Sequence, residues 1–282
     1  MRIGIVGLGL IGGSFAKATS QRTGHEVLGW DTNAASLERA LAEGAIGEVL
    51  TPDKLSGLDL LLLGVVPHAA VEYVREHASL IRGLVIDLCG VKRAVSREIL
   101  PLSRQHGFKY LGGHPMAGRE RGGYESALPT LFDKCAMILV PHDDQGIPEE
   151  ISEYISILGF DRIEVSEDAR HDRIVAYSSH MAHVVSTNYC KSPTGPEHWG
   201  YSADSLRDMT RVATLNPVMW SELFIANKDN ILKEVQRLVR DIETMADALE
   251  REDRDELTRL LEEGRAAKER LYPRGVEWEE SR

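Results

Sequence analysis

The sequence predicts a two-domain protein: a doubly wound, mostly parallel α/β domain over residues 1–166, then an all-α domain over residues 167–282. Three observations support this prediction. The first half alternates short β-branched runs with helical patterns, as in βαβ units. Its apolar runs are continuous, which is typical of parallel strands covered on both faces. From Asp168 onward, extended runs give way to helical periodicity.

The expected strands of the first domain are short, and each is an apolar run of strand length. Helices are expected between them, for example over Ala34–Glu43 and His68–Ile81. In chain order, the expected strands are Ile3–Val6, Glu26–Asp31, Leu58–Val66, Gly83–Leu88, Lys109–Gly112, Ala136–Val140 and Arg162–Val165.

The second half is predicted to hold helices at about 171–190, 216–250 and 253–271, with a Pro-, Gly- and Ser-rich loop at Lys191–Ser205. The segment Pro217–Leu249 is too long for an ordinary surface helix of a small domain. Its apolar residues recur at three- and four-residue steps, so one face should be buried, and a second copy of the chain could cover it. The sequence therefore predicts a homodimer. The polar end, Pro273–Arg282, is expected to fray.

Composition excludes several classes of function. The net charge is −11, and without a basic stripe this argues against nucleic acid as a partner. Only three cysteines occur, Cys89, Cys135 and Cys190, so a disulfide framework is not expected. No apolar run has the length of a membrane span, and the first residues read as a strand rather than a signal peptide. We therefore expect a cytoplasmic protein that does not bind membranes.

A glycine-rich turn follows the first strand and opens a helix. Gly7 allows the tight turn, Gly9 lets the backbone approach a pyrophosphate, and Gly12 allows close packing of helix and strand. Leu10 and Ile11 open the helix, whose free N–H groups and dipole favour phosphate. The pattern predicts a Rossmann dinucleotide site, with a glycine-rich turn of another α/β fold as the alternative.

A carboxylate strengthens the dinucleotide interpretation. Asp31 ends the second strand, about 20 residues after the glycines, where an acid accepts hydrogen bonds from the adenosine ribose. Val66, at the end of the third apolar run, is assigned to the same site. Because no arginine follows Asp31, the predicted cofactor is NAD.

Four segments beyond the nucleotide site resemble the prephenate/arogenate dehydrogenase family over nearly the whole chain, and the second of them is the most specific. The resemblance implies NAD-dependent oxidative decarboxylation of prephenate to 4-hydroxyphenylpyruvate in tyrosine biosynthesis, with arogenate as the alternative substrate. The segments are DLCGVK (Asp87–Lys92), GGHPMAG (Gly112–Gly118), SHMAH (Ser179–His183) and DMTRVA (Asp208–Ala213).

His114 is the predicted catalytic base. Taken alone, a histidine in a glycine-flanked loop after a strand is more often a surface residue, but the family motif favours the base. Imidazole can accept the substrate hydroxyl proton near neutral pH without a large pKa shift.

The resemblance places the substrate contacts around this histidine. Arg211, in the DxTR pattern, is expected to hold a substrate carboxylate through two parallel hydrogen bonds. Glu120 matches a family acid near the site entrance that can pair with such an arginine. Each has a plain alternative, as a helix-surface arginine and a solvated loop glutamate.

His180 and His183 share a face of a predicted helix, and the resemblance implies that both line the substrate pocket. Their spacing suits a metal pair, but no nearby carboxylate or cysteine pair completes a site, so no metal is predicted. Trp220 matches a family aromatic near the pocket, and an interface or core tryptophan is equally compatible with the sequence.

Two departures from the family bear on the site. Gly90 stands where the family commonly has a serine that orients the histidine, so a backbone group, Cys89 or a water is expected to replace it. Asp204 stands where relatives carry glycines, and it could meet a substrate ammonium or cap a helix. Charge near the substrate side chain, from His183, Asp204 and Arg207, favours prephenate.

Two other functions are compatible with a Rossmann domain followed by helices. A β-hydroxyacid dehydrogenase would carry a catalytic lysine in the first helix after the Rossmann domain, and 171–190 contains none. A nucleotide-binding sensor without catalysis would not need His114 or Arg211, and both are present.

Overall fold

The computed structural model describes residues 1–142 and 146–272, so the fraying expected of Pro273–Arg282 lies outside the described residues. The chain forms two compact units, Met1–Ile231 and Leu232–Arg282. The division falls inside helix α10 (Lys228–Glu250), well after the predicted boundary at residue 166. The last strand of the sheet ends at Val165, next to the predicted boundary. The division of the chain into domains at residue 166 stays a prediction.

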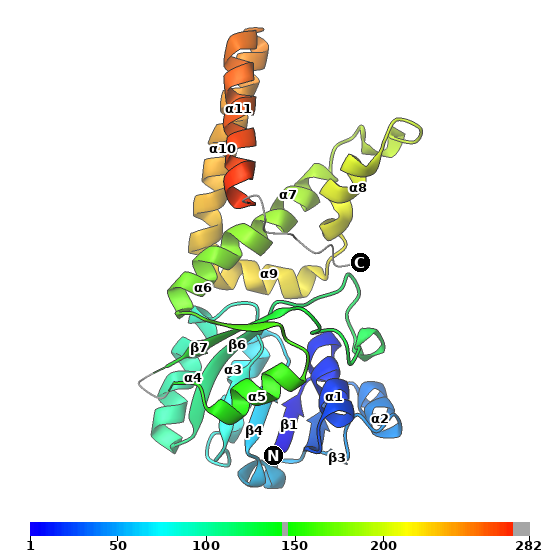
Figure 1. Cartoon of the computed structure of the whole chain (residues 1–282), viewed down its shortest axis with the longest axis vertical. Helices are drawn as coiled ribbons and strands as arrows, with labels where there is room; N and C mark the ends of the chain where they lie inside the picture. Colours follow the sequence, from blue (N-terminus) through cyan, green and yellow to red (C-terminus); the bar gives the residue numbers. More distant parts are fainter. Residues whose placement is uncertain (143–145, 273–282) are drawn as a thin grey trace. The chain divides into compact units, whose positions relative to one another are not determined.

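The first unit is built on one eight-stranded sheet with the order β3-β2-β1-β4-β5-β6-β7-β8 (Figure 1). All neighbouring strands are parallel except β6 and β7, which confirms a mostly parallel sheet. The strands are β1 Arg2–Val6, β2 Glu26–Trp30, β3 Glu48–Val49, β4 Leu60–Leu63, β5 Leu84–Asp87, β6 Lys109–Pro115, β7 Ala136–Pro141 and β8 Arg162–Val165.

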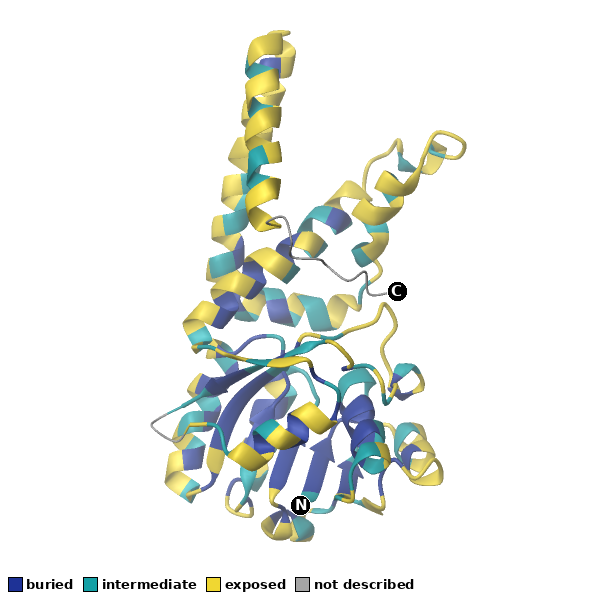
Figure 2. Cartoon of the chain, viewed as in Figure 1, coloured by how far each residue is buried: buried dark blue, intermediate teal, exposed yellow. Residues whose placement is uncertain are grey.

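Both faces of the sheet are buried, as the continuous apolar runs predicted. In β4, Leu60 and Leu62 join one hydrophobic cluster while Leu61 and Leu63 join the other. Residues of α1 and α5 enter the first cluster, and residues of α3 and α4 enter the second. Figure 2 shows the central strands of the sheet buried, whereas the edge strand β8 is mostly exposed. These helices and α2 are α1 Leu10–Arg22, α2 Ala34–Ala42, α3 Pro67–His77, α4 Arg93–His106 and α5 Glu149–Ile157.

One boundary matters for function. The predicted strand Lys109–Gly112 continues to Pro115, so His114 lies within β6 and not in a loop after it. The extension arises because β7 pairs antiparallel with β6, with His114 opposite Ile138. The expectation of a loop histidine is therefore wrong. Its position near the carboxyl end of β6 is retained.

The predicted helix at 171–190 forms as α6 (Asp168–Val175) and α7 (Met181–Tyr189), joined by a π-helical turn over Ala176–His180. Single π turns of this kind recur at functional sites. The chain continues through the short helix α8 (Asp204–Thr210) to α9 (Pro217–Ala226).

The single long helix expected over Pro217–Leu249 is wrong, because it divides at Asn227 into α9 and α10. Asn227 is buried, and its backbone leaves the helical region at φ −115° and ψ 22°. Its side-chain Nδ2 donates to the backbone oxygen of Asp172 at 2.7 Å. A buried amide that satisfies a tertiary contact thus interrupts the helix, which sequence periodicity does not detect.

The second unit contains the rest of α10 and α11 (Arg254–Leu271). The Asp253 side chain begins α11 by accepting a hydrogen bond from the Glu256 backbone at 3.0 Å. Several large apolar side chains on this unit face solvent: Leu232, Val239, Ile242, Met245, Leu249, Leu261 and Leu271. No helix within the described ranges is both long and apolar enough to cross a membrane.

Candidate active site

The glycine turn has the geometry that a dinucleotide requires. Gly7 adopts φ +85°, a left-handed conformation that other residues rarely take. A Cβ on Gly12 would lie 1.9 Å from the Gly7 oxygen, so only glycine lets α1 pack this close to β1. A Cβ on Gly9 would meet nothing within 4 Å, which leaves open space for a pyrophosphate beside the backbone. The residues present fit the cofactor.

Asp31 follows β2 and lies beside this turn. Its Oδ2 accepts a hydrogen bond from the Leu8 backbone at 2.6 Å, and its Oδ1 accepts one from the Asn33 backbone at 2.7 Å. Leu10 and Ile11 are the first residues of α1, and Val66 is the residue that precedes α3. The predicted cofactor residues therefore follow the carboxyl ends of β1, β2 and β4.

We expect NAD to be preferred over NADP by about tenfold or more. The Asp31 carboxylate would lie near the phosphate of NADP, and like charges about 4 Å apart repel by roughly 1–4 kcal/mol at effective dielectrics of 80 to 20. Thr32 and Asn33 follow and offer no compensating cation. The test compares kcat/KM for the two cofactors in the parent and in Asp31→Ser, where the gap should narrow. Equal efficiencies in the parent would contradict this role of Asp31.

His114 is joined to a second histidine on the helical part of the first unit. Its Nδ1 lies 2.9 Å from Nε2 of His171, on α6, and the two rings meet edge to face. His171 Nδ1 in turn lies 2.8 Å from Oδ1 of Asp172. His171 and Asp172 are both buried. Because Nδ1 of His114 contacts His171, the other ring nitrogen, Nε2, lies on the side of Gly90.

Three groups were expected to replace the family serine at Gly90: a backbone group, Cys89 or a water. The expectation missed His171, which contacts His114 directly. Cys89 instead donates its thiol to the Val65 carbonyl at 3.5 Å. The one feature of the sequence that could have indicated this contact is the adjacent pair His171-Asp172 near the start of a helix. The sequence alone does not show that this pair lies beside β6.

The pKa of His114 lies well below its usual value. Burial is the largest cause, followed by the electrostatic influence of His171, Lys92 and His180, all of which disfavour the protonated ring. The expectation of no large shift is therefore wrong. A lowered pKa keeps His114 neutral, and so able to accept a proton, throughout the neutral range.

A buried ion pair lies beneath the strand that carries His114. Lys92 Nζ donates to Oδ1 of Asp87 and to the backbone oxygen of Gly113, the residue before His114. The Tyr110 hydroxyl donates to Oδ2 of Asp87 at 2.7 Å. Lys92 and Asp87 have no exposed surface, so each charge depends on the other.

His180, His183 and Trp220 form an aromatic group on α7, the π turn and α9. The ring of Trp220 lies 3.6 Å from that of His183 and 5.9 Å from that of His180, centroid to centroid. His183 Nδ1 donates to the Val212 carbonyl at 2.8 Å. The two histidines therefore share a face, as predicted.

The pKa values of both histidines fall, chiefly through burial. The pKa of His180 falls to about 4 although Asp172 opposes the shift. The pKa of His183 is lowered by burial and also by the positive charge of Arg211. Arg211 is exposed and begins the short turn Arg211–Ala213 after α8, so its contact with substrate stays a prediction. His180 is 1% exposed, so its contact with substrate stays a prediction.

Two predicted residues are not brought to this group by any contact. Glu120 is exposed and makes no ion pair among the described residues. Asp204 is the first residue of α8 but provides no cap, because the preceding residue, Ala203, occupies the cap position. Its carboxylate is 3.1 Å from Arg207 and faces solvent, so of the two roles considered for Asp204 the helix cap is wrong.

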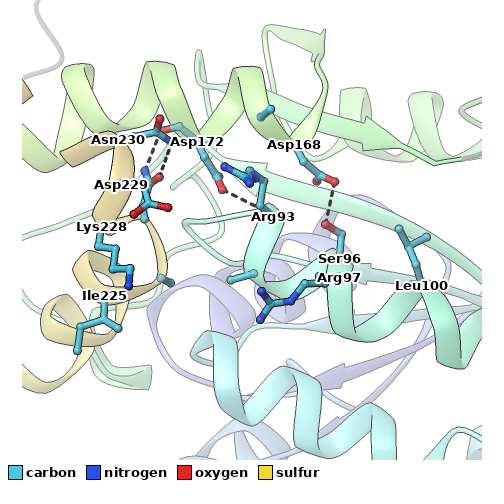
Figure 3. Close-up of a pocket in the computed structure, with 14 residues that line it drawn as sticks. Arg93, Ser96, Arg97, Leu100, Asp168, Asp172, Ile225, Lys228, Asp229 and Asn230 are labelled. Carbon is cyan, nitrogen blue, oxygen red and sulfur yellow. Dashed lines mark hydrogen bonds between the residues drawn. The ribbon is translucent and has the colours of Figure 1, made fainter. Parts of the chain in front are cut away.

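A cavity of about 600 Å³ borders Asp172, the last residue in the series His114, His171 and Asp172 (Figure 3). Its lining comes from α4, α6 and the junction of α9 with α10, and includes Asp172 and Asn227. None of the predicted catalytic, substrate or cofactor residues lines it. This hollow is therefore separate from the site around His114.

A dinucleotide turn and a half-buried, neutral histidine at the carboxyl edge of one parallel sheet define a two-domain NAD-dependent dehydrogenase. The particular family follows from comparison with known proteins. Residues 15–159 match the nucleotide-binding domain of prephenate dehydrogenase, and residues 167–263 match its dimerization domain. The chain belongs to the prephenate dehydrogenase family.

Individual relatives agree with this assignment. A cyclohexadienyl dehydrogenase of Zymomonas mobilis is 29% identical over 94% of each chain. A prephenate dehydrogenase of Bacillus subtilis is 27% identical over 91% of this chain and 72% of its own. The fold is similar to that of the A. aeolicus prephenate dehydrogenase solved with hydroxyphenyl propionate and NAD+, with a TM-score of 0.81, 24% identity and coverage of 96% and 98%.

Proposed function

We propose that this chain catalyses the NAD-dependent oxidative decarboxylation of prephenate to 4-hydroxyphenylpyruvate, a step of tyrosine biosynthesis. The observation that carries the proposal is His114 near the carboxyl end of β6, with Nδ1 bonded to His171 and Nε2 on the side of Gly90. Gly7, which follows β1, lies at the same edge of the parallel sheet. Ligands of open α/β sheets bind at this edge.

The reaction needs a base that accepts the substrate hydroxyl proton and later returns it. Bound NAD supplies an acceptor for the hydride from the hydroxyl-bearing ring carbon. His114 Nε2 accepts the hydroxyl proton as that hydride departs, and the ring carboxylate then leaves as CO2 as the ring becomes aromatic. The product keeps its hydroxyl, so the oxygen takes the proton back from His114. Neither proton nor electron is left over.

The remaining site residues act on the two carboxylates and the side chain of the substrate. Arg211 holds a carboxylate, since a guanidinium can bind it through two hydrogen bonds. His183, packed on Trp220, is assigned to the same region on the family pattern. Glu120 and His180 are assigned to the entrance and the wall of the pocket on the family pattern.

Substrate choice depends on charge near the side chain, where prephenate has a keto group and arogenate an ammonium. Asp204 is the acidic candidate, yet its carboxylate is paired with Arg207 and faces solvent. Arg211, the expected partner of a substrate carboxylate, adds a positive charge. This balance favours the dianionic prephenate.

The experiment follows NADH absorbance with each substrate at matched concentrations. We expect turnover with prephenate and a lower kcat/KM with arogenate. A higher kcat/KM for arogenate would contradict the proposed substrate, and no NADH with either would contradict the proposed reaction.

We also propose that the protein is a cytoplasmic homodimer formed through its helical half. The solvent-facing apolar side chains of α10 and α11 support this, since such surfaces usually mark an interface. The match of residues 167–263 to a dimerization domain gives independent support. Light scattering at micromolar concentration should give twice the mass of the 31.3 kDa chain. The mass of one chain would contradict the dimer.

A further inference from the structure

We propose that His171 and Asp172 are positioning residues that fix the tautomer and orientation of His114 and stabilise the proton it borrows. This inference rests on the proposed function and extends it to residues for which the predicted mechanism had no role. Three contacts in series support it: His114 to His171, His171 to Asp172, and Asp172 to the beginning of α4.

The end of the series is a firmly held carboxylate. Asp172 Oδ1 accepts a hydrogen bond from the Lys92 backbone at 2.8 Å, and Oδ2 accepts one from the Arg93 backbone at 3.0 Å. These N–H groups begin α4, where the helix dipole also favours a negative charge. Burial raises the pKa of Asp172, but the hydrogen bonds from His171 and from these two N–H groups outweigh it and leave the pKa lowered. Asp172 is thus an acceptor at neutral pH.

This carboxylate determines which nitrogens carry protons. Because Asp172 can only accept, His171 Nδ1 must donate to it, and a neutral His171 then has a lone pair on Nε2. His114 Nδ1 must donate to that lone pair. Nε2 of His114 is therefore left unprotonated. This is the nitrogen that can receive the substrate proton.

The same series of contacts stabilises His114 after it has accepted the substrate proton. When His114 Nε2 takes the hydroxyl proton, burial and the electrostatic influence of His171, Lys92 and His180 disfavour the positive charge. The hydrogen bond from His114 Nδ1 to His171 acts in the other direction, since it strengthens when its donor is charged, and Asp172 holds His171 in place as the acceptor. The proton returns to the substrate oxygen when the ring becomes aromatic, so the series needs no exit to solvent.

Gly90 removes the hydroxyl that the family pattern places beside the His114 ring, on its Nε2 side. A Cβ at Gly90 would lie 3.9 Å from His114 Nε2 and 3.4 Å from Leu223, so a serine would fit there in ordinary contact. Without that hydroxyl, the contact on Nδ1 is the one hydrogen bond to the His114 ring among the described residues. His114 therefore depends on α6 for its orientation.

The test compares two replacements of His171 in the full-length enzyme with NAD. Leucine removes the acceptor, whereas the amide oxygen of glutamine can still accept from His114 Nδ1. We expect His171→Leu to lower kcat on the order of 10²-fold with KM for prephenate within about twofold. His171→Gln should recover kcat to within about tenfold of the parent.

Nitrogen-15 spectra of labelled histidine give a readout that packing alone would not change. In the parent, His114 should show a protonated Nδ1 and an unprotonated Nε2, and His171→Leu should shift protonation toward Nε2. The spectrum of the parent needs neither substrate nor a folded variant. Its outcome is therefore independent of whether prephenate is the substrate.

Ser96→Ala is the matched control. Ser96 Oγ donates to Asp168 Oδ2 at 2.8 Å, and this bond joins α4 to α6, as the contacts of Asp172 do. It should lower the melting temperature but leave kcat unchanged. A protonated Nε2 in the parent would overturn the proposal. So would a folded His171→Leu variant with parental kcat, or glutamine and leucine variants with equal losses.

Discussion

Replacing His114 by asparagine is expected to lower kcat with prephenate by about 10²–10⁴-fold, the usual cost of losing a positioned general base. Asparagine can still donate from its amide toward His171, so the strand and the contact with α6 should survive. It offers no basic nitrogen to the substrate hydroxyl. NAD binding should be unchanged, because the glycine turn follows β1 and makes no contact with His114 among the described residues.

The measurement is kcat and KM for both substrates, with NAD affinity from fluorescence quenching. His25→Asn is the control, since His25 directly precedes β2 at the amino edge of the sheet and should leave kcat unchanged. Because the pKa of His114 is lowered, the acidic limb of the kcat/KM profile should fall below pH 6.5 in the parent. A variant that kept a tenth of the activity would require another base.

Replacing Lys92 by methionine is expected to cost about 3–5 kcal/mol of folding free energy, because it leaves the buried Asp87 charge without its partner. Methionine has similar length and apolar volume, so lost packing contributes little. The Tyr110 hydroxyl and the Cys89 backbone still donate to Asp87 but bring no positive charge. The loss should also loosen His114, since Lys92 binds the carbonyl of Gly113.

Denaturant unfolding measures this cost, and Lys54→Met is the matched control. Lys54 pairs with Glu48 at 2.9 Å, but these side chains are 28% and 51% exposed, in contrast to the fully buried Lys92 and Asp87. Exposed pairs contribute about 0–1 kcal/mol, so the control should unfold near the parent midpoint. If Lys92→Met and Lys54→Met unfolded at the same denaturant concentration, the buried pair of Lys92 and Asp87 would stabilise the fold no more than an exposed pair.

Most of the fold could be predicted because buried parallel strands leave a local signal. The strand β4, Leu60–Leu63, is apolar at every position, as expected of a strand buried on both faces. The short strand β3 escaped prediction because Glu48–Val49 has no apolar run. The antiparallel pairing of β7 with β6, which extends the strand to His114, is set by tertiary contacts that no local pattern encodes.

The candidate site divides in the same way. The glycine turn, Asp31 and His114 lie in short motifs whose spacing carries the chemistry, so sequence alone predicted them. His171 is far along the chain from His114, and only the packing of α6 over β6 brings the two rings together. The break at Asn227 has a similar cause, since the buried amide serves Asp172 rather than its own helix.

The most direct test of the proposed reaction uses prephenate with deuterium on the hydroxyl-bearing ring carbon. Hydride transfer from that carbon predicts deuterated NADH and 4-hydroxyphenylpyruvate without the label, with one CO2 released for each NADH formed. Label retained in the product together with unlabelled NADH would contradict hydride transfer from the carbon whose hydroxyl proton His114 accepts.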